Sequence, residues 1–185
     1  MRLAATPLPG CMTVDIEPHV DSRGFFARIW CAEEFAAAGL PAGVAQCSLS
    51  RNTRRGTVRG MHLQRPPGQE GKLVRCVRGA VLDVALDLRH DSPTFRQHIA
   101  VELSAENYRA LYVPPGCAHG FQTLLDETEV LYQMTAPFAP ELSAGVRWND
   151  PAFGIRWPLS DVTILERDRA YPDFDAAAYA GLSWT

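Results

Sequence analysis

The feature that most limits what this chain can fold into is a long series of short segments in which apolar and polar side chains alternate. The series runs from about residue 44 to about residue 150, and turn residues such as Gly, Pro, Asp and Ser separate its segments. Alternation with a period of two is typical of β-strands that present two different faces. Strands that recur about every 8–12 residues with turns between them are typical of a sandwich or barrel. We therefore predict an all-β fold.

Outside this series the chain carries a few shorter elements. We expect a strand at residues 12–16, a turn followed by an aromatic strand at 21–30, and a short helix at 31–39 that stops at Gly39. Residues 160–174 predict a turn that leads into a small terminal helix. The length of 185 residues suits a single domain. Its expected parts are an N-terminal arm with the short helix at 1–45, a core at 46–150 and a C-terminal segment at 151–185.

Composition and charge exclude several functional classes. The net charge is −3 with scattered signs, so no basic face indicates binding to nucleic acid or to an anionic membrane. No apolar run approaches the ~20 residues that a membrane span requires, and the N-terminus lacks the apolar core of a signal peptide. An odd number of cysteines without a CxxC pair suits a reducing compartment, which predicts a cytoplasmic protein. We expect all the thiols to be buried: Cys11, Cys31, Cys47, Cys76 and Cys117.

The segment at residues 80–89 alternates so regularly that its two faces can be assigned. One face carries only aliphatic side chains, and the other carries two carboxylates around a small apolar residue. Carboxylates on one face of a strand line either water or a polar cavity, and the sequence alone leaves both alternatives open. The aliphatic face is Leu82, Val84, Leu86 and Leu88, and the other is Asp83, Ala85 and Asp87.

The stretch at residues 56–75 gathers side chains that favour chemistry on an anion. It contains His62, the nearby Arg59 and, ten residues after the histidine, Lys72. Lys72 is the only lysine in the chain, since every other strongly basic residue is arginine. A flexible ammonium and a planar guanidinium are not interchangeable. A lysine at this one place therefore indicates a need for a movable point charge, although chance survival of one lysine is the simpler alternative.

The spacing around two histidines resembles the two halves of a cupin barrel. The first half reads GTVRGMHLQ at residues 56–64, and the second reads PPGCAHG at 114–120. This resemblance implies a cupin-type jelly roll, that is, a double-stranded β-helix. In metal-binding cupins a second histidine occupies the place of Gln64, and a neutral amide oxygen is a poor replacement for imidazole or carboxylate.

Two uses remain for the histidines of these two motifs. A metal could still be held by His62, Glu70 and His119, which would make the chain a metal-dependent cupin enzyme. The alternative that we favour has no metal site. In that case the two imidazoles, beside Arg59 and Lys72, would serve proton transfer on an anionic substrate, because a neutral imidazole is a suitable general base near pH 7.

A more specific resemblance extends over nearly the whole chain, from about residue 23 to about residue 172. In order and in register, its motifs resemble those of the dTDP-4-dehydrorhamnose 3,5-epimerase family. The family epimerises a nucleotide-linked 4-keto-6-deoxy sugar, in which the C4 ketone acidifies the protons at C3 and C5. The motifs are RGFF (23–26), VRGMHLQ (58–64), KLVRCVRGAVLDVALDLR (72–89), SPTF (92–95), LSAEN (103–107), PPGCAHGF (114–121), VLYQMT (130–135), WNDPAFGIRWP (148–158) and ERD (166–168).

The resemblance implies catalytic roles that match this chemistry, which needs a base, an acid on the opposite face of the sugar and a group that stabilises the enolate. By position, His62 is similar to the family's base and Tyr132 to its proton donor. Lys72 corresponds to the cation beside the developing oxyanion. Asp168 corresponds to the carboxylate paired with the histidine, and Asp83 is a second candidate for that pairing. No redox cofactor and no metal are implied.

Substrate-binding residues and a partner are implied in the same way. The resemblance gives three arginines as diphosphate contacts, since guanidinium forks suit phosphate oxygens, two polar contacts to substrate and one aromatic ring stacked on the nucleobase. It also implies a homodimer in which one of these arginines, Arg23, serves the partner's site. The simpler alternatives are solvated surface charges for the arginines, core packing for Tyr132 and helix capping for Asp168. The implied binding residues are Arg23, Gln46, Arg59, His119, Phe138 and Arg167.

The chain departs from the family pattern mainly where the family contacts the nucleobase. Arg28 stands where an acidic residue is common, Gln46-Cys47-Ser48 replaces a QDN motif, and QMTAPF at 133–138 replaces a KTTDYY-like segment. The sequence therefore leaves open which nucleobase the implied nucleotide-sugar substrate carries. An epimerase that inverts one carbon only, or that acts on another nucleotide sugar, remains an alternative, as does a non-catalytic sugar-nucleotide binding protein.

Overall fold

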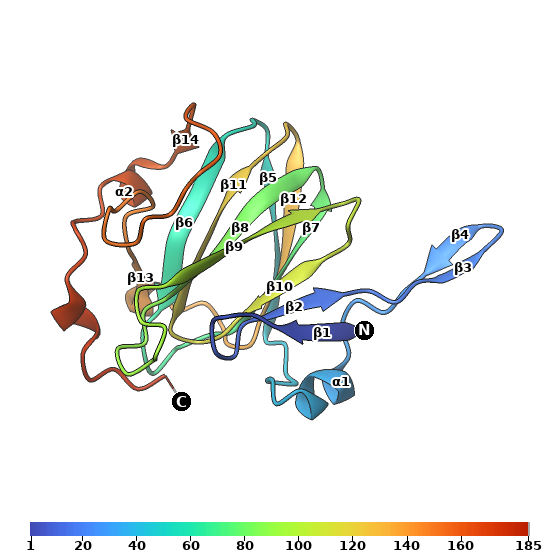
Figure 1. The fold of residues 1–185 in the computed structure, drawn as a ribbon, viewed down its shortest axis with the longest axis horizontal. Coiled ribbons are helices and arrows are strands. Elements are labelled where there is room, and N and C mark those ends of the chain that lie inside the picture. The colour runs from blue at the N-terminus through green and yellow to red at the C-terminus, as the bar shows by residue number, and fades with distance from the viewer. Residues whose placement is uncertain (185) are drawn as a thin grey trace.

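A computed structural model describes residues 1–184 of the chain. Two β-sheets face each other, and a strand pair projects from them as an arm (Figure 1). In the first sheet the order is β1-β2-β10-β7-β12-β5: β1 (Arg2–Ala5), β2 (Met12–Asp15), β10 (Ala110–Val113), β7 (Lys72–Arg78), β12 (Thr128–Met134) and β5 (Gln46–Asn52). In the second it is β13-β6-β11-β8-β9: β13 (Ser143–Gly145), β6 (Thr57–Gln64), β11 (Cys117–Thr123), β8 (Ala80–Asp87) and β9 (His98–Ser104); β14 (Thr163–Ile164) also pairs with β6.

This arrangement confirms the predicted all-β fold of cupin type. The alternating segments between residues 44 and 150 form the strands. Most consecutive strands alternate between the two sheets, as β5, β6 and β7 do, whereas β8 and β9 pair within the second sheet. The strand expected at 12–16 is β2. The helices are few and short, as expected: α1 (Ala32–Ala37), α2 (Glu166–Arg169), η1 (Pro140–Leu142) and η2 (Ala176–Tyr179). The division of the domain at residues 45 and 150 stays a prediction.

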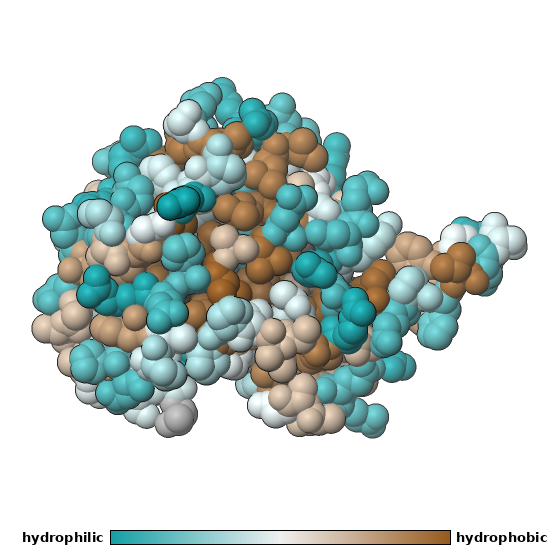
Figure 2. All heavy atoms as spheres, in the orientation of Figure 1, coloured by the Kyte–Doolittle hydropathy of each residue, from teal (hydrophilic) through white to brown (hydrophobic). Residues whose placement is uncertain are grey.

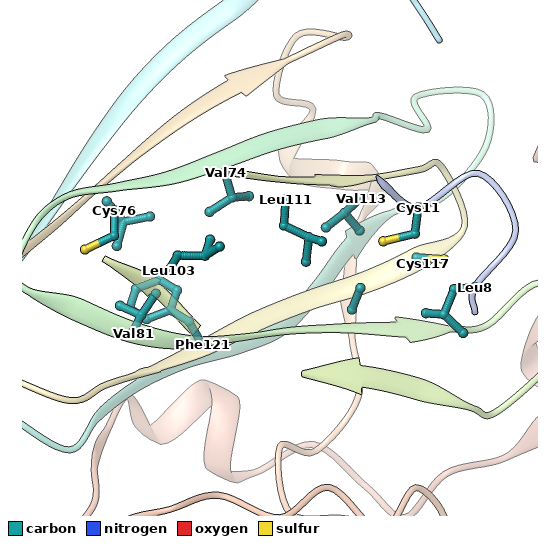
Figure 3. Packing of buried hydrophobic residues seen from close by; sticks show 12 residues of the cluster. Leu8, Cys11, Val74, Cys76, Val81, Leu103, Leu111, Val113, Cys117 and Phe121 are labelled. Atoms are coloured by element: carbon teal, nitrogen blue, oxygen red, sulfur yellow. The ribbon is translucent and has the colours of Figure 1, made fainter. Parts of the chain in front are cut away.

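Apolar side chains from both sheets meet in a core between them (Figure 3). Val74 and Leu111 come from the first sheet, and Leu103 and Phe121 from the second, and all four are almost fully buried. Interior packing of this kind is the main favourable contribution to folding. Tyr132 packs against the same cluster at its edge. The apolar core therefore fills only part of the space between the sheets.

Both faces of β8 are buried, so its carboxylate face borders the interior of the protein and not water. Leu86 and Leu88 pack under the C-terminal segment, in a cluster with Phe153 and Tyr179. The carboxylates face away from water: Asp83 and Asp87 are each 0% exposed. Buried carboxylates of this kind need hydrogen-bond partners. Arg89, Ser92 and Thr94 all donate to Asp87.

Helix α1 covers the outer face of the first sheet with one large side chain. Phe35 is buried against Val14 and Tyr112. The chain leaves the helix through Gly39, whose φ of +73° is a left-handed conformation that favours glycine. The predicted helix and its stop are therefore confirmed. No helix among residues 1–184 is long and apolar enough to cross a membrane.

The arm is a two-stranded hairpin of β3 (His19–Asp21) and β4 (Gly24–Phe26) that stands away from both sheets (Figure 1). The expected aromatic strand at 21–30 is wrong in its extent, because β4 pairs only with the three residues of β3 and regular structure stops at Phe26. Apolar residues lie along the arm (Figure 2), and Val20 and Phe26 are each 77% exposed.

The expectation that every thiol is buried is wrong for two of the cysteines. Cys47 is exposed, because it lies on β5 at the edge of its sheet and points away from the interior that its neighbours Gln46 and Ser48 line. Cys31 is half-buried beside the start of α1, whereas the remaining three are buried as expected.

Candidate active site

A cavity of about 750 Å³ opens between the two sheets beyond the apolar core. Strands of both sheets and the segment around α2 contribute to its walls. A second hollow of about 420 Å³ adjoins it and shares several of its residues. The cavity is lined, among others, by the predicted site residues Arg59, His62, Lys72, His119, Tyr132, Phe138, Arg167 and Asp168, and Gln46 lines the adjoining hollow.

Histidine and tyrosine face each other from different sheets. His62 lies on β6 directly opposite His119 of β11 in the second sheet. Tyr132 lies on β12 of the first sheet, in register with Val74 and Ser48 on its two neighbours. Because side chains of facing sheets point toward each other across the interior, a molecule in the cavity would have His62 on one side and Tyr132 on the other.

A buried carboxylate holds the imidazole of His62. Nε2 of His62 and Oδ1 of Asp168 are 2.8 Å apart, and the Asp168 side chain is 3% exposed. The short strand β14 runs parallel to β6, pairing Thr163 with Thr57, and thereby brings α2 with its aspartate to the histidine. The amide of Gly60 adds a longer hydrogen bond to Oδ2 of Asp168, at 3.4 Å.

The charge state of Asp168 determines which nitrogen of His62 can accept a proton. Burial alone would raise the pKa of Asp168, but the hydrogen bond from His62 and the Arg167 guanidinium at 3.1 Å outweigh burial and lower this pKa. The ionised carboxylate can only accept, so in the neutral imidazole Nε2 carries the proton. Nδ1 then keeps its lone pair, and it has no hydrogen-bond partner among residues 1–184. This arrangement leaves Nδ1 as the basic atom.

Tyr132 is held as a neutral phenol. Burial is the main cause of a strongly raised pKa for Tyr132. Its hydroxyl lies 3.4 Å from Oγ of Ser50, and its ring stands edge-on to the His119 ring with centroids 6.0 Å apart. A phenol that stays protonated can donate a proton to a carbanion formed beside it.

Lys72 supplies a cation near His62 and Tyr132. Its Nζ donates to the backbone carbonyl of His62 at 3.3 Å and lies 3.0 Å from Oε1 of Glu70. Both side chains of this ion pair are mostly buried, with exposed fractions of 13% and 8%. An ammonium in such a site interacts with a developing oxyanion more strongly than it would in water.

The second candidate for pairing with His62, Asp83, pairs with the other histidine instead. Nε2 of His119 and Oδ1 of Asp83 are 2.8 Å apart, and both side chains are buried. The other carboxylate oxygen of Asp83 has no hydrogen-bond partner among the described residues. His119 thus reaches the cavity with one ring nitrogen already engaged.

The predicted binding residues are brought together, except for one. Arg59 and Arg167 lie on the cavity wall, where the Nε of Arg59 donates to Oδ1 of Asn52 at 2.7 Å. Arg23 is not in the cavity: it lies in the turn of the arm and pairs with Asp21 at 2.6 Å. Phe138 is largely exposed at the cavity wall.

The metal-dependent alternative required His62, Glu70 and His119 to converge, and they do not. Glu70 faces Lys72, His119 faces Asp83, and His62 faces Asp168. No group of three or more His, Cys, Asp or Glu side chains within the described chain is arranged to hold a metal ion.

Two polar residues of β5 that support the site were not predicted from the sequence. Ser50 is the hydroxyl partner of Tyr132, and Asn52 orients Arg59. Both continue the alternation that begins at Gln46 and Ser48, so they share a face with a residue already assigned to the site. The period of two along β5 was therefore a signal that could have identified them.

Comparisons with known proteins agree with this geometry. A family model described as dTDP-4-dehydrorhamnose 3,5-epimerase matches residues 5–176. The protein of that name from Pseudomonas aeruginosa is 46% identical over 166 residues, covering 86% of this chain and 91% of the relative. The crystal structure of the enzyme from Bacillus anthracis, with TDP and PPi bound, aligns with a TM-score of 0.90 at 35% identity and covers 94% of this chain and 99% of that one. ChmJ, a 3'-monoepimerase from Streptomyces bikiniensis in complex with dTDP-quinovose, aligns with a TM-score of 0.86 at 33% identity, covering 96% and 90%.

Proposed function

The chain belongs to the dTDP-4-dehydrorhamnose 3,5-epimerase family, and from that membership we propose how its cavity inverts a nucleotide-linked 4-keto-6-deoxy sugar. The protein is an isomerase, and its substrate carries a ketone at C4 that acidifies the neighbouring C–H bonds. Relatives named for dTDP-4-dehydrorhamnose support a dTDP-linked substrate.

The proton is removed by His62. Nδ1 takes the proton from C3 or C5, and the electron pair of the broken C–H bond moves toward the C4 oxygen to give an enolate. Asp168 stabilises the imidazolium that forms, because its lowered pKa keeps it ionised beside Nε2. Lys72 stabilises the negative charge on the C4 oxygen.

The proton is returned by Tyr132 to the opposite face of the same carbon, which inverts its configuration. The observation that carries this proposal is the position of the two groups on facing sheets of one cavity, with His62 on β6 and Tyr132 on β12. A base and an acid on the same wall would restore the original configuration instead.

The remaining residues bind the nucleotide. Arg59 and Arg167 on the cavity wall contact the diphosphate, since fixed guanidinium groups suit phosphate oxygens. His119 and Gln46 supply polar contacts, and the largely exposed Phe138 ring packs on the base. The protein acts in the cytoplasm.

The functional unit is a homodimer, in which the arm of one subunit reaches the site of the other. Three features of the arm support this: it stands away from its own sheets, it exposes Val20 and Phe26, and it carries Arg23 outside its own cavity. Sedimentation of the purified protein tests this part directly, and a monomer at the concentration of the activity assay would refute it.

Proton exchange tests the whole proposal. The enzyme is incubated in D2O with dTDP-4-keto-6-deoxyglucose, and the C3 and C5 proton signals are followed by NMR. Loss of both signals, abolished in His62→Ala, is expected for a 3,5-epimerase, and loss of one signal identifies a mono-epimerase. If a folded enzyme exchanges neither proton, the proposed substrate is wrong.

A further inference from the structure

Two glutamine side chains hold the short segment at residues 137–139. The backbone N–H of Phe138 donates to Oε1 of Gln46 at 2.7 Å. The backbone N–H of Ala139 donates to Oε1 of Gln64 at 2.6 Å, and Nε2 of Gln64 donates to the carbonyl of Pro137 at 3.1 Å. Each residue of the segment is thus bound to a glutamine amide.

Gln64 is built into this place from several directions. Its side chain also donates to the carbonyl of Gly68 at 2.8 Å and, more weakly, to Oε2 of Glu70 at 3.4 Å. The residue is 2% exposed. A buried amide whose oxygen and N–H groups are all bonded fixes the groups around it, and removing it leaves their polar atoms without partners. Gln64, at the cupin ligand position, therefore links residues 68–70 to the segment at 137–139.

The segment carries the Phe138 ring, which lines both hollows of the site, as Tyr132 also does. Phe138 lines the main cavity and the adjoining hollow, and its ring is largely exposed. Just before the segment, the backbone N–H of Thr135 donates to the carbonyl of Gly71 at 3.0 Å. Among the described residues, the side chains of the two glutamines make the hydrogen bonds that join residues 137–139 to the barrel wall.

We propose that Gln64 and Gln46 are positioning residues that hold the segment at 137–139, and with it the Phe138 ring, in place for the planar base of the nucleotide. The inference rests on the proposed function, because it assumes that a nucleotide occupies the site. A ring on a fixed backbone loses less conformational freedom on binding than a ring on a mobile loop. The two glutamines should therefore affect nucleotide affinity much more than the proton-transfer step.

The test uses Gln64→Met and Gln46→Met, which keep most of the side-chain length and remove the hydrogen bonds. The matched control is Gln97→Met, at an exposed glutamine away from the cavity. Amide hydrogen exchange should accelerate at Ala139 in Gln64→Met and at Phe138 in Gln46→Met, whereas the amide of Thr135 should be unaffected. Each variant has its own reporter amide, so Gln46→Met keeps the test valid if Gln64→Met, at the buried glutamine, fails to fold.

Affinity for dTDP, measured by titration calorimetry, gives the functional readout. A neutral hydrogen bond contributes a factor of about 2 to 12 in an equilibrium constant, so we expect Kd for dTDP to rise about that much in Gln46→Met and more in Gln64→Met. In a Phe138→Ala background Gln64→Met should change Kd less than about twofold, because the ring that Gln64 positions is gone.

Each outcome supports or overturns the proposal. Faster exchange at the reporter amides, weaker dTDP binding and loss of that effect without Phe138 would support it. Unchanged exchange, unchanged Kd, or a Kd effect of Gln64→Met that persists fully in Phe138→Ala would overturn it. Failure of the proposed function is recognised separately: the wild-type enzyme would then bind no dTDP and exchange no sugar proton.

Discussion

Replacing Asp168 with asparagine isolates what the carboxylate contributes to the reaction. The substitution keeps the shape of the side chain that lies 2.8 Å from Nε2 of His62 and 3.1 Å from Nε of Arg167, but removes its charge. A hydrogen bond to a charged group contributes about 1.5–3 kcal/mol and a neutral one about 0.5–1.5 kcal/mol. The difference of ~1–1.5 kcal/mol applies mainly when His62 becomes an imidazolium, and ~1.4 kcal/mol in a barrier is a tenfold change in rate.

We therefore expect kcat of Asp168→Asn to fall about tenfold, with KM nearly unchanged because Asp168 is buried behind His62. The loss is larger if the new amide donates to Nε2, since Nδ1 would then carry the proton and could not act as the base. Deuterium exchange at C3 and C5 at pH 7 measures the rate. The control is Asp91→Asn, whose side chain is 99% exposed. A kcat of Asp168→Asn equal to that of wild type would refute the dyad.

The same substitution changes how stability depends on pH. The pKa of Asp168 is lowered by folding, so this carboxylate contributes stability at pH values above its unfolded pKa of ~3.9. That contribution disappears as the pH falls through the lower, folded pKa. Urea unfolding at pH 7 and at pH 3 should therefore show a smaller loss of unfolding free energy on acidification for Asp168→Asn than for wild type. An equal loss in both proteins would contradict the lowered pKa.

Three further predictions concern the other site residues. Lys72→Met should lower kcat about 100-fold with little change in KM, because the charge on the enolate oxygen loses its cation; steady-state kinetics of the folded variant would check this, and a change in KM alone would contradict it. Arg59→Lys should raise KM about tenfold at constant kcat, since a lysine cannot both bond Asn52 through Nε and present a fork to phosphate; an unchanged KM would remove Arg59 from the binding site. Burial raises the pKa of Tyr132, so kcat/KM should stay level on the alkaline side through the ordinary phenol range near pH ~10; a decline centred below pH 9 would show that Tyr132 is not the acid.

The fold could be predicted where a strand's two faces differ in chemistry. The alternation of β8 identified the strand and its faces, but not what lay beyond the carboxylate face. That answer depends on the neighbouring strand β11, whose His119 side chain pairs with Asp83. The prediction was least accurate for the arm. The length of β4 is limited by the three residues of β3 that pair with it, and nothing in DSRGFFARIW shows where this pairing ends.

The site could be predicted in its residues but not in their contacts. The motif resemblance gave Asp168 as the histidine's partner, and the structure shows how a carboxylate 106 positions away in sequence reaches it. The two-residue strand β14 makes that approach, and two residues are too short to carry a periodic signal. Similarly, comparison with metal-binding cupins identified the position of Gln64, but its partners at 137–139 come from a distant loop.

One measurement tests the central claim that His62 and Tyr132 act from opposite walls. In Tyr132→Phe the base remains while the opposite proton donor is lost. After incubation with the 4-keto sugar nucleotide in D2O, we predict deuterium at the exchanging carbon with the original configuration retained and almost no inverted product, as resolved by NMR. Inverted, deuterated product formed at the wild-type rate would contradict the claim, because the proton would then reach the opposite face without Tyr132.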